Sequence, residues 1–147
     1  MALGMVALLA ALWGGLLRLG WDWPSVRPTL PVAHGPLMIS GFLGTLIGLE
    51  RAVALGQRWT YAGPLLSGLG ALALIVGLPG VAGPMLMAMG SLTLVVVFAA
   101  IVRRQPGLSE IIMGIGALAW LVGNGLWLSG WPIFRVVGWW AAFLVLT

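Results

Sequence analysis

The chain has 147 residues, of which 61% are hydrophobic and only 7% are charged. A water-soluble domain usually carries about 25% charged residues, so this chain has too little polar surface to cover a globule in water. The sequence therefore predicts that lipid surrounds most of the protein. It also excludes disulfides, thiolate zinc sites and cysteine nucleophiles, because it contains no Cys.

The basic charge of the chain does not indicate nucleic-acid binding, which needs a clustered basic face. The seven basic residues are all Arg and are scattered along the chain, each beside an apolar run: Arg18, Arg27, Arg51, Arg58, Arg103, Arg104 and Arg135. This pattern is typical of the loops and interfaces of membrane proteins. We therefore expect the lipid bilayer as a partner and no nucleic acid.

Five segments meet or approach the length of about 20 mostly apolar residues that a membrane-spanning helix needs. They cover approximately residues 1–19, 32–55, 61–78, 84–102 and 111–128. The third and fourth are separate, because residues 59–102 carry no charge and one helix of that length would measure about 66 Å, far more than the hydrocarbon thickness. Pro79-Gly80 and Gly83-Pro84 predict the turn between them.

The last segment, residues 136–147, is apolar but too short to cross a membrane by itself. We interpret it as part of a sixth helix, and residues 1–147 as a single transmembrane domain in the N-terminal part of a longer protein. The alternative is a short amphipathic or re-entrant tail. The predicted fold is an all-α, polytopic transmembrane helix bundle of five helices plus a partial sixth. Further helices would come from a missing C-terminal segment or from a homo-oligomer.

Loop Arg residues indicate an orientation. Four Arg fall on the side of the N-terminus and three on the other side, which favours a cytoplasmic N-terminus in a bacterial inner membrane. Small residues recur every four positions in the second segment, at Ser40, Gly44, Gly48 and Ala52. This spacing predicts a seam at which the backbone of a neighbouring helix approaches closely.

His34, the only His, lies near the start of the second segment, and we expect the helix to begin close to it. A projection at 100° per residue places it on one face with Met38, Gly41, Thr45 and Gly48. The positive end of a helix disfavours an imidazolium, and a neutral imidazole is the form that binds metals and haem. His34 is therefore a candidate ligand, and Met38 a candidate axial ligand or packing residue. The alternative is that His34 caps the helix or hydrogen-bonds a loop.

Two further polar features lie in apolar segments. Glu50 and Arg51 would form an ion pair at the membrane interface, or an entry point for protons or ions. Asn124 would hydrogen-bond a neighbouring helix, or line a substrate or proton path.

Residues Val32-Ala33-His34-Gly35-Pro36-Leu37-Met38-Ile39, followed by Gly41-Phe42-Leu43-Gly44, carry a resemblance to two kinds of protein. The stretch resembles the second helix of haem–copper oxidase catalytic subunits, in which a His after Ala is an axial haem ligand. It is also similar to the NnrS-type bacterial membrane proteins, which are polytopic and linked to haem and nitric oxide stress. The resemblance covers about 20 residues and implies a haem-ligand role for His34 alone.

The histidines of the copper site and of the second haem have no counterpart in this chain, so oxidase activity within it is excluded. No complete catalytic constellation is visible, and we expect that the chain is not an enzyme by itself. The leading hypothesis is a membrane protein associated with haem through His34. The alternatives are a transporter or permease fragment that uses Glu50 and Asn124, and a non-catalytic structural subunit.

Overall fold

The computed structural model describes residues 1–24 and 27–147, and in that part of the chain all regular structure is helical, with no β-strand. This confirms the all-α prediction. The α-helices are α1 (Ala2–Arg18), α2 (Leu30–Pro36), α3 (Gly44–Leu55), α4 (Ala62–Val76), α5 (Ala82–Arg104), α6 (Leu108–Leu128) and α7 (Ile133–Leu146). A π-helical segment, Leu37–Leu43, joins α2 to α3, and a 3₁₀ turn, Arg58–Tyr61, precedes α4.

Four continuous helical stretches are long and apolar enough to cross a membrane: Leu30–Leu55, Arg58–Val76, Ala82–Arg104 and Leu108–Leu128. Two shorter apolar helices, α1 and α7, accompany them. The predicted number of five full-length helices is not confirmed, because α1 has 17 residues and measures only about 26 Å. The predicted last segment is helical but begins earlier, after Pro132, whose backbone is extended.

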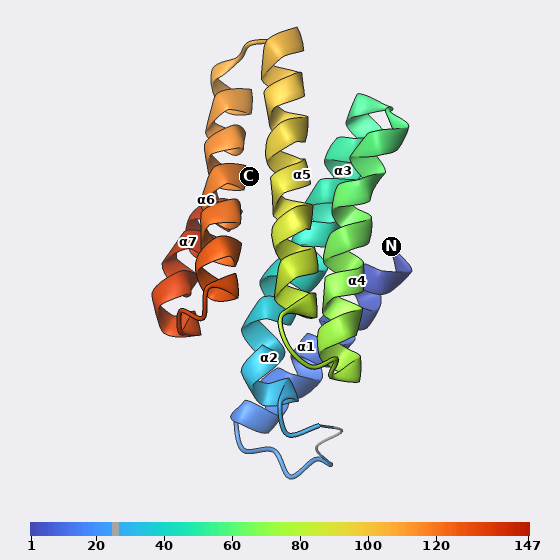
Figure 1. Ribbon diagram of the computed structural model, residues 1–147, viewed down its shortest axis with the longest axis vertical. Coiled ribbons are helices and arrows are strands. Elements are labelled where there is room, and N and C mark those ends of the chain that lie inside the picture. Colours follow the sequence, from blue (N-terminus) through green and yellow to red (C-terminus); the bar gives the residue numbers. More distant parts are fainter. Residues whose placement is uncertain (25–26) are drawn as a thin grey trace.

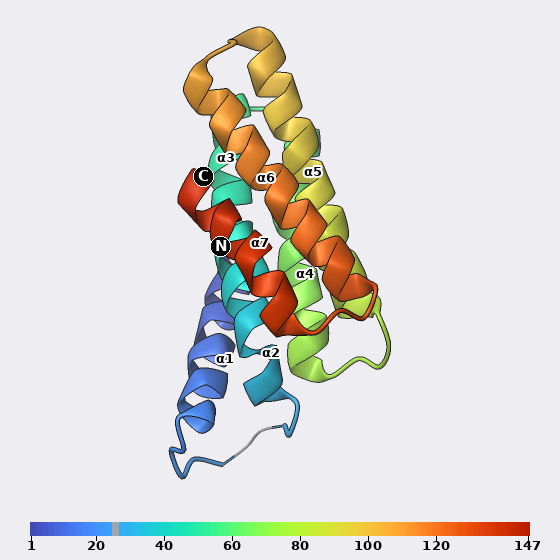
Figure 2. The same cartoon turned by 90° about the vertical axis from the view of Figure 1, so that its left-hand side faces the viewer.

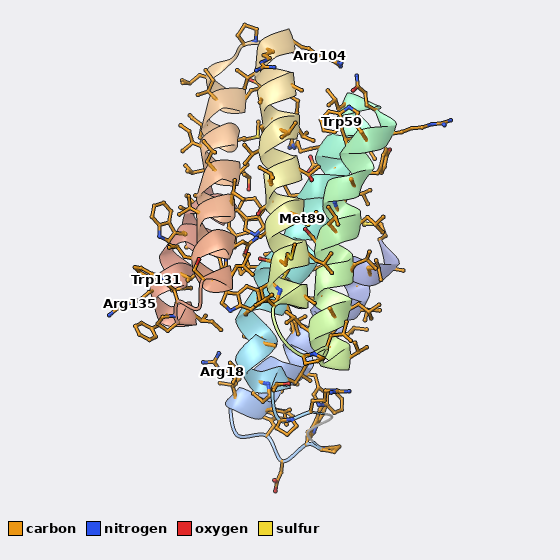
Figure 3. All side chains as sticks on the ribbon, viewed as in Figure 1. Arg18, Trp59, Met89, Arg104, Trp131 and Arg135 are labelled. Atoms are coloured by element: carbon orange, nitrogen blue, oxygen red, sulfur yellow. The ribbon has the colours of Figure 1, made fainter. Side chains whose placement is uncertain are left out.

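The helices lie side by side along one long axis (Figures 1 and 2). Residues 19–24 and 27–29 and the connections 77–81 and 129–132 lie toward the end drawn at the bottom of Figure 1, which we call the lower end. The connections 56–57 and 105–107 lie at the upper end. Figure 3 places Arg18 and Arg135 near the lower end and Arg104 at the upper end. The sequence predicted the same division of these residues between the two sides of the membrane.

The turn between α4 and α5 lies two residues earlier than the sequence predicted. Helix α4 ends at Val76, and its C-cap is Gly77, which has a left-handed backbone conformation (φ 70°). Helix α5 begins at Ala82, so Gly83-Pro84 lies in its first turn and not in the connection. Proline fits there because the first turn of a helix does not use its N–H groups.

The predicted seam of small residues is buried, with Ser40 and Ala52 fully inaccessible and both glycines covered. Its neighbours, however, include side-chain rings. A Cβ at Gly44 would overlap the indole of Trp120, and a Cβ at Gly48 would lie 3.4 Å from the ring of Pro64. Because glycine has no side chain, Gly44 and Gly48 leave room for Trp120 of α6 and Pro64 of α4.

The fully buried positions of α1 are all small residues: Gly4, Ala7, Ala11 and Gly14. A Cβ at Gly14 would lie 2.7 Å from the carbonyl oxygen of Leu30, so the backbones of α1 and α2 meet here. This close approach brings main-chain carbonyl groups of α1 within reach of side chains on α2.

We expect Gly44→Ala to destabilise the protein by about 1–3 kcal/mol, because its methyl group would displace the buried Trp120 ring. The measurement is the apparent melting temperature in detergent. Gly125→Ala in α6 is the matched control, since nothing lies within 4 Å of a Cβ there. An unchanged melting temperature for Gly44→Ala would contradict the packing described.

Candidate functional site

The imidazole of His34 is held by the backbone of α1. Its Nδ1 lies 2.7 Å from the carbonyl oxygen of Ala11. A carbonyl oxygen only accepts hydrogen bonds, so Nδ1 carries the hydrogen and, in the neutral ring, Nε2 carries the lone pair. A hydrogen bond from Nδ1–H to a backbone carbonyl is the arrangement that orients metal-ligating histidines. Nε2 makes no hydrogen bond to the described part of the chain.

The helix begins at Leu30, two residues before the predicted segment that starts at about residue 32, so His34 lies just inside it. His34 does not cap the helix, because the residue at the cap position is Thr29 and no side chain forms a cap hydrogen bond. The imidazole instead bonds a neighbouring helix, where Gly15 leaves it room: a Cβ there would lie 3.0 Å from Nδ1.

Beside His34 lies a groove of about 920 Å³ between the α2 side and the α6–α7 hairpin, which we call the His34 groove. Its walls are mostly apolar and aromatic. The main lining side chains are His34, Met38, Trp127, Trp131, Phe134 and Trp140, with Arg18 as the one cation among them. The groove lies toward the lower end, where Figure 3 labels Arg18 and Trp131.

The predicted shared face is largely observed. Met38 lines the groove with His34. Thr45 contacts the position of Gly4 in α1, whereas a Cβ at Gly41 would lie 2.8 Å from Ala71 of α4 and 3.1 Å from Ala7 of α1. Gly48 departs from the α1 side and meets α4 alone. The 100° projection fails there because a π-helix has more residues per turn than an α-helix.

Asn124 forms the centre of a buried hydrogen-bond network. Its Oδ1 accepts from the Ser40 hydroxyl at 2.9 Å and from the Trp140 indole N–H at 3.0 Å, and its Nδ2 donates to the Met87 carbonyl at 3.3 Å. The Trp120 indole N–H donates to Ser40 at 3.0 Å. The network joins the π-helical segment to α5, α6 and α7. Asn124 thus bonds neighbouring helices, and each atom of its amide group has a partner.

Trp140 connects this network to the groove, because its indole bonds Asn124 and its ring lines the groove wall. Sequence analysis did not select Trp140, Trp120 or Ser40 as site residues. One signal was present: Trp120 and Asn124 are four residues apart and therefore share a helix face. The sequence does not indicate that Ser40 and Trp140, which lie on other segments, are the hydrogen-bond partners of these two residues.

Glu50 and Arg51 form an ion pair with a separation of 3.1 Å. The Glu50 side chain is 65% exposed, whereas that of Arg51 is 24% exposed and its guanidinium carbon lies 5.9 Å from the centre of the Phe98 ring. A small space that Gly48 and Trp120 help to line admits no water molecule.

Within residues 1–24 and 27–147, no three His, Asp or Glu side chains gather into a group that could hold a metal ion. A metal at His34 would therefore need most of its ligands from groups other than these side chains.

The comparisons with known proteins identify a family but no activity. A family described as "Domain of unknown function (DUF8744)" matches residues 1–147. No curated protein and no solved structure matches the chain.

We expect Asn124→Leu to destabilise the protein by about 1–3 kcal/mol, because Ser40 and Trp140 would lose their buried acceptor. Melting in detergent measures the loss. Ser129→Ala is the control, since the Ser129 hydroxyl is exposed and bonds only the Gly125 carbonyl of its own helix. Equal melting temperatures for the two variants would show that the network contributes little to stability.

Proposed function

The chain belongs to the DUF8744 family, and we propose that it is a membrane protein that binds haem in the His34 groove, where Nε2 of His34 would hold the iron. The observation that carries the proposal is the hydrogen bond from Nδ1 of His34 to Ala11, which leaves the lone pair on Nε2 in a residue that lines a large groove. The resemblance of the sequence around His34 to haem-binding helices points to the same residue.

The donor set of the site fits haem. One imidazole is too little for a metal ion held by protein alone, but the four porphyrin nitrogens supply the remaining equatorial ligands of haem iron. The His34 ring is fixed by its second nitrogen, as is usual for ligating histidines. When bound through one imidazole, haem supplies an iron centre that takes up small molecules or carries electrons.

The groove also fits a flat apolar group. Its volume of about 920 Å³ lies at the upper end of the range of ordinary ligand pockets, about 300–1,000 Å³. Trp127, Trp131, Phe134 and Trp140 offer ring faces and edges against which a macrocycle packs. We assign Met38 a packing role, because it lies one turn from His34 on the same helix and therefore faces the same side of a macrocycle.

The setting that we propose is a bacterial inner membrane with a cytoplasmic N-terminus. The four long apolar helices support a membrane location, as do the many large apolar side chains on the outer surface. In this proposal α1 and α7 also lie in the bilayer beside the four longer helices, as the fifth helix and the partial sixth.

The alternative functions have less support. A transporter that uses Glu50 and Asn124 needs a polar path, but the Asn124 amide is taken up by hydrogen bonds to Ser40, Trp140 and Met87. A purely structural subunit predicts no pocket that converges on a polar side chain, whereas the His34 groove converges on an imidazole and a guanidinium.

The proposal predicts a Soret absorption band when the purified protein is reconstituted with haem, and the loss or clear shift of that band in His34→Ala. Met38→Leu, which keeps the volume of a groove residue, is the control and should leave the band in place. A spectrum that is the same in the wild type and in His34→Ala would remove the proposal.

A further inference from the structure

A second groove lies on the outer surface between α1 and α4 and shares no lining residue with the His34 groove. Its volume is about 280 Å³, and we call it the Arg27 groove. Its apolar lining comes from α1, α2 and α4: Val6, Leu9, Ala10, Trp13, Leu30 and Ile75. The remaining lining residue is Arg27, so among the described residues the groove carries one cation and no acid.

The apolar part of the Arg27 groove faces the surroundings of the protein and not its core. Val6 and Leu9 are 43% and 63% exposed. Ala10 and Ile75 lie deeper, because both pack against the buried cluster of α1, α2 and α4. In the membrane setting proposed above, this surface contacts hydrocarbon. The groove is therefore a furrow in the lipid-facing surface, with Ala10 and Ile75 at its floor.

Trp13 marks the end of the furrow that lies at the membrane interface. Its indole N–H donates to the Pro24 carbonyl at 3.2 Å, and its ring centre lies 4.5 Å from that of Trp23. Both partners belong to residues 19–24 at the lower end. Trp side chains are enriched at the membrane–water interface, because an apolar ring there carries a polar N–H. The furrow thus runs from the hydrocarbon at Val6 to the interface at Trp13, about 10 Å along α1.

Arg27 holds a positive charge at this interfacial end. Its guanidinium occupies the space beside Gly77, the C-cap of α4, where a Cβ would overlap it. The negative end of the α4 dipole stabilises a cation at this place. The one ion pair of the described residues is Glu50–Arg51, so neither Asp22 nor another described acid neutralises Arg27. The charge is therefore held in position and free to meet an anion.

We propose that the Arg27 groove binds one anionic phospholipid, with an acyl chain along the furrow and the phosphate on Arg27. The groove is complementary to such a lipid in both parts, since apolar side chains meet the hydrocarbon and the one cation meets the negative charge. A guanidinium donates two parallel hydrogen bonds to phosphate oxygens. The volume is under a third of that of the His34 groove and suits one flexible chain. The inference rests on the proposed membrane setting and not on haem.

The test is native mass spectrometry of the purified chain in detergent, which resolves bound lipids one by one. The chain is titrated with phosphatidylglycerol and with phosphatidylcholine that carry the same acyl chains and differ in net charge. We expect the first phosphatidylglycerol to bind about fivefold more tightly than the first phosphatidylcholine, the effect of one basic residue near a lipid headgroup. Arg27→Gln should weaken phosphatidylglycerol binding by the same factor and leave phosphatidylcholine unchanged. Arg27→Lys keeps the charge and should retain most of the preference.

Further variants separate the charge from the furrow. Arg104→Gln removes a cation at the upper end (Figure 3) that lines neither groove, and it should change neither affinity. Ala10→Leu fills the floor of the furrow and should weaken binding of both lipids. Leu9→Trp covers the same furrow from an exposed position, so it serves where Ala10→Leu lowers the melting temperature.

Four results would overturn the proposal. They are equal binding of the two lipids by the wild type, an equal loss in Arg104→Gln and Arg27→Gln, and unchanged binding when the furrow is filled. The fourth is displacement of phosphatidylglycerol by an equal concentration of glycerol 3-phosphate, because Arg27 would then bind a free anion. A protein dimer that excludes the lipid would likewise assign the furrow to a second copy of the chain. His34→Ala should leave every lipid affinity unchanged, so this outcome is independent of the haem spectrum.

Discussion

Polar atoms among apolar helices have no water to bond, so each must find its partner within the protein, and Asn124 meets this demand for several segments at once. Its amide accepts from Ser40 and Trp140 and donates to the backbone at Met87. An amide that fails to reach even one of these partners would leave a buried donor or acceptor unpaired. The positions of α5, α6, α7 and the π-helical segment are therefore interdependent, and the wall of the groove formed by Trp140 follows from them.

The other wall depends on a different constraint, the close packing of backbones. Helix α1 presents only small buried residues to its neighbours, so its main chain comes close enough for the Ala11 carbonyl to bond His34. A larger residue at Gly14 would push α1 away from Leu30 and break this contact. Gly14, which lies three residues from Ala11, thus allows the close contact in which the Ala11 carbonyl fixes the tautomer of the His34 imidazole.

Local features of this chain could be predicted from sequence, whereas features that join distant segments could not. The helices follow from the length of the apolar runs, and the Glu50–Arg51 pair follows from adjacency in the chain. Ser40 and Asn124 are separated by 84 positions, and nothing in either segment names the other as its partner. The groove escaped prediction for the same reason, because its two walls come from opposite ends of the sequence. Helix α2 begins slightly before the predicted start near residue 32, because Pro31 fits its first turn.

The π-helical segment shows how the two constraints meet. Residues 37–43 include Met38, which lines the groove, Ser40, which bonds Asn124, and Gly41, whose Cβ position lies 2.8 Å from Ala71. A π-helix is rare because its wider turn is less favourable than an α-helix, and it frequently marks a functional site. Here about one and a half turns of the wider helix supply one residue to the groove, one to the hydrogen-bond network and one to the contact with α4. The segment therefore contributes both to the wall of the groove, through Met38, and to the hydrogen-bond network that holds the α6–α7 hairpin, through Ser40.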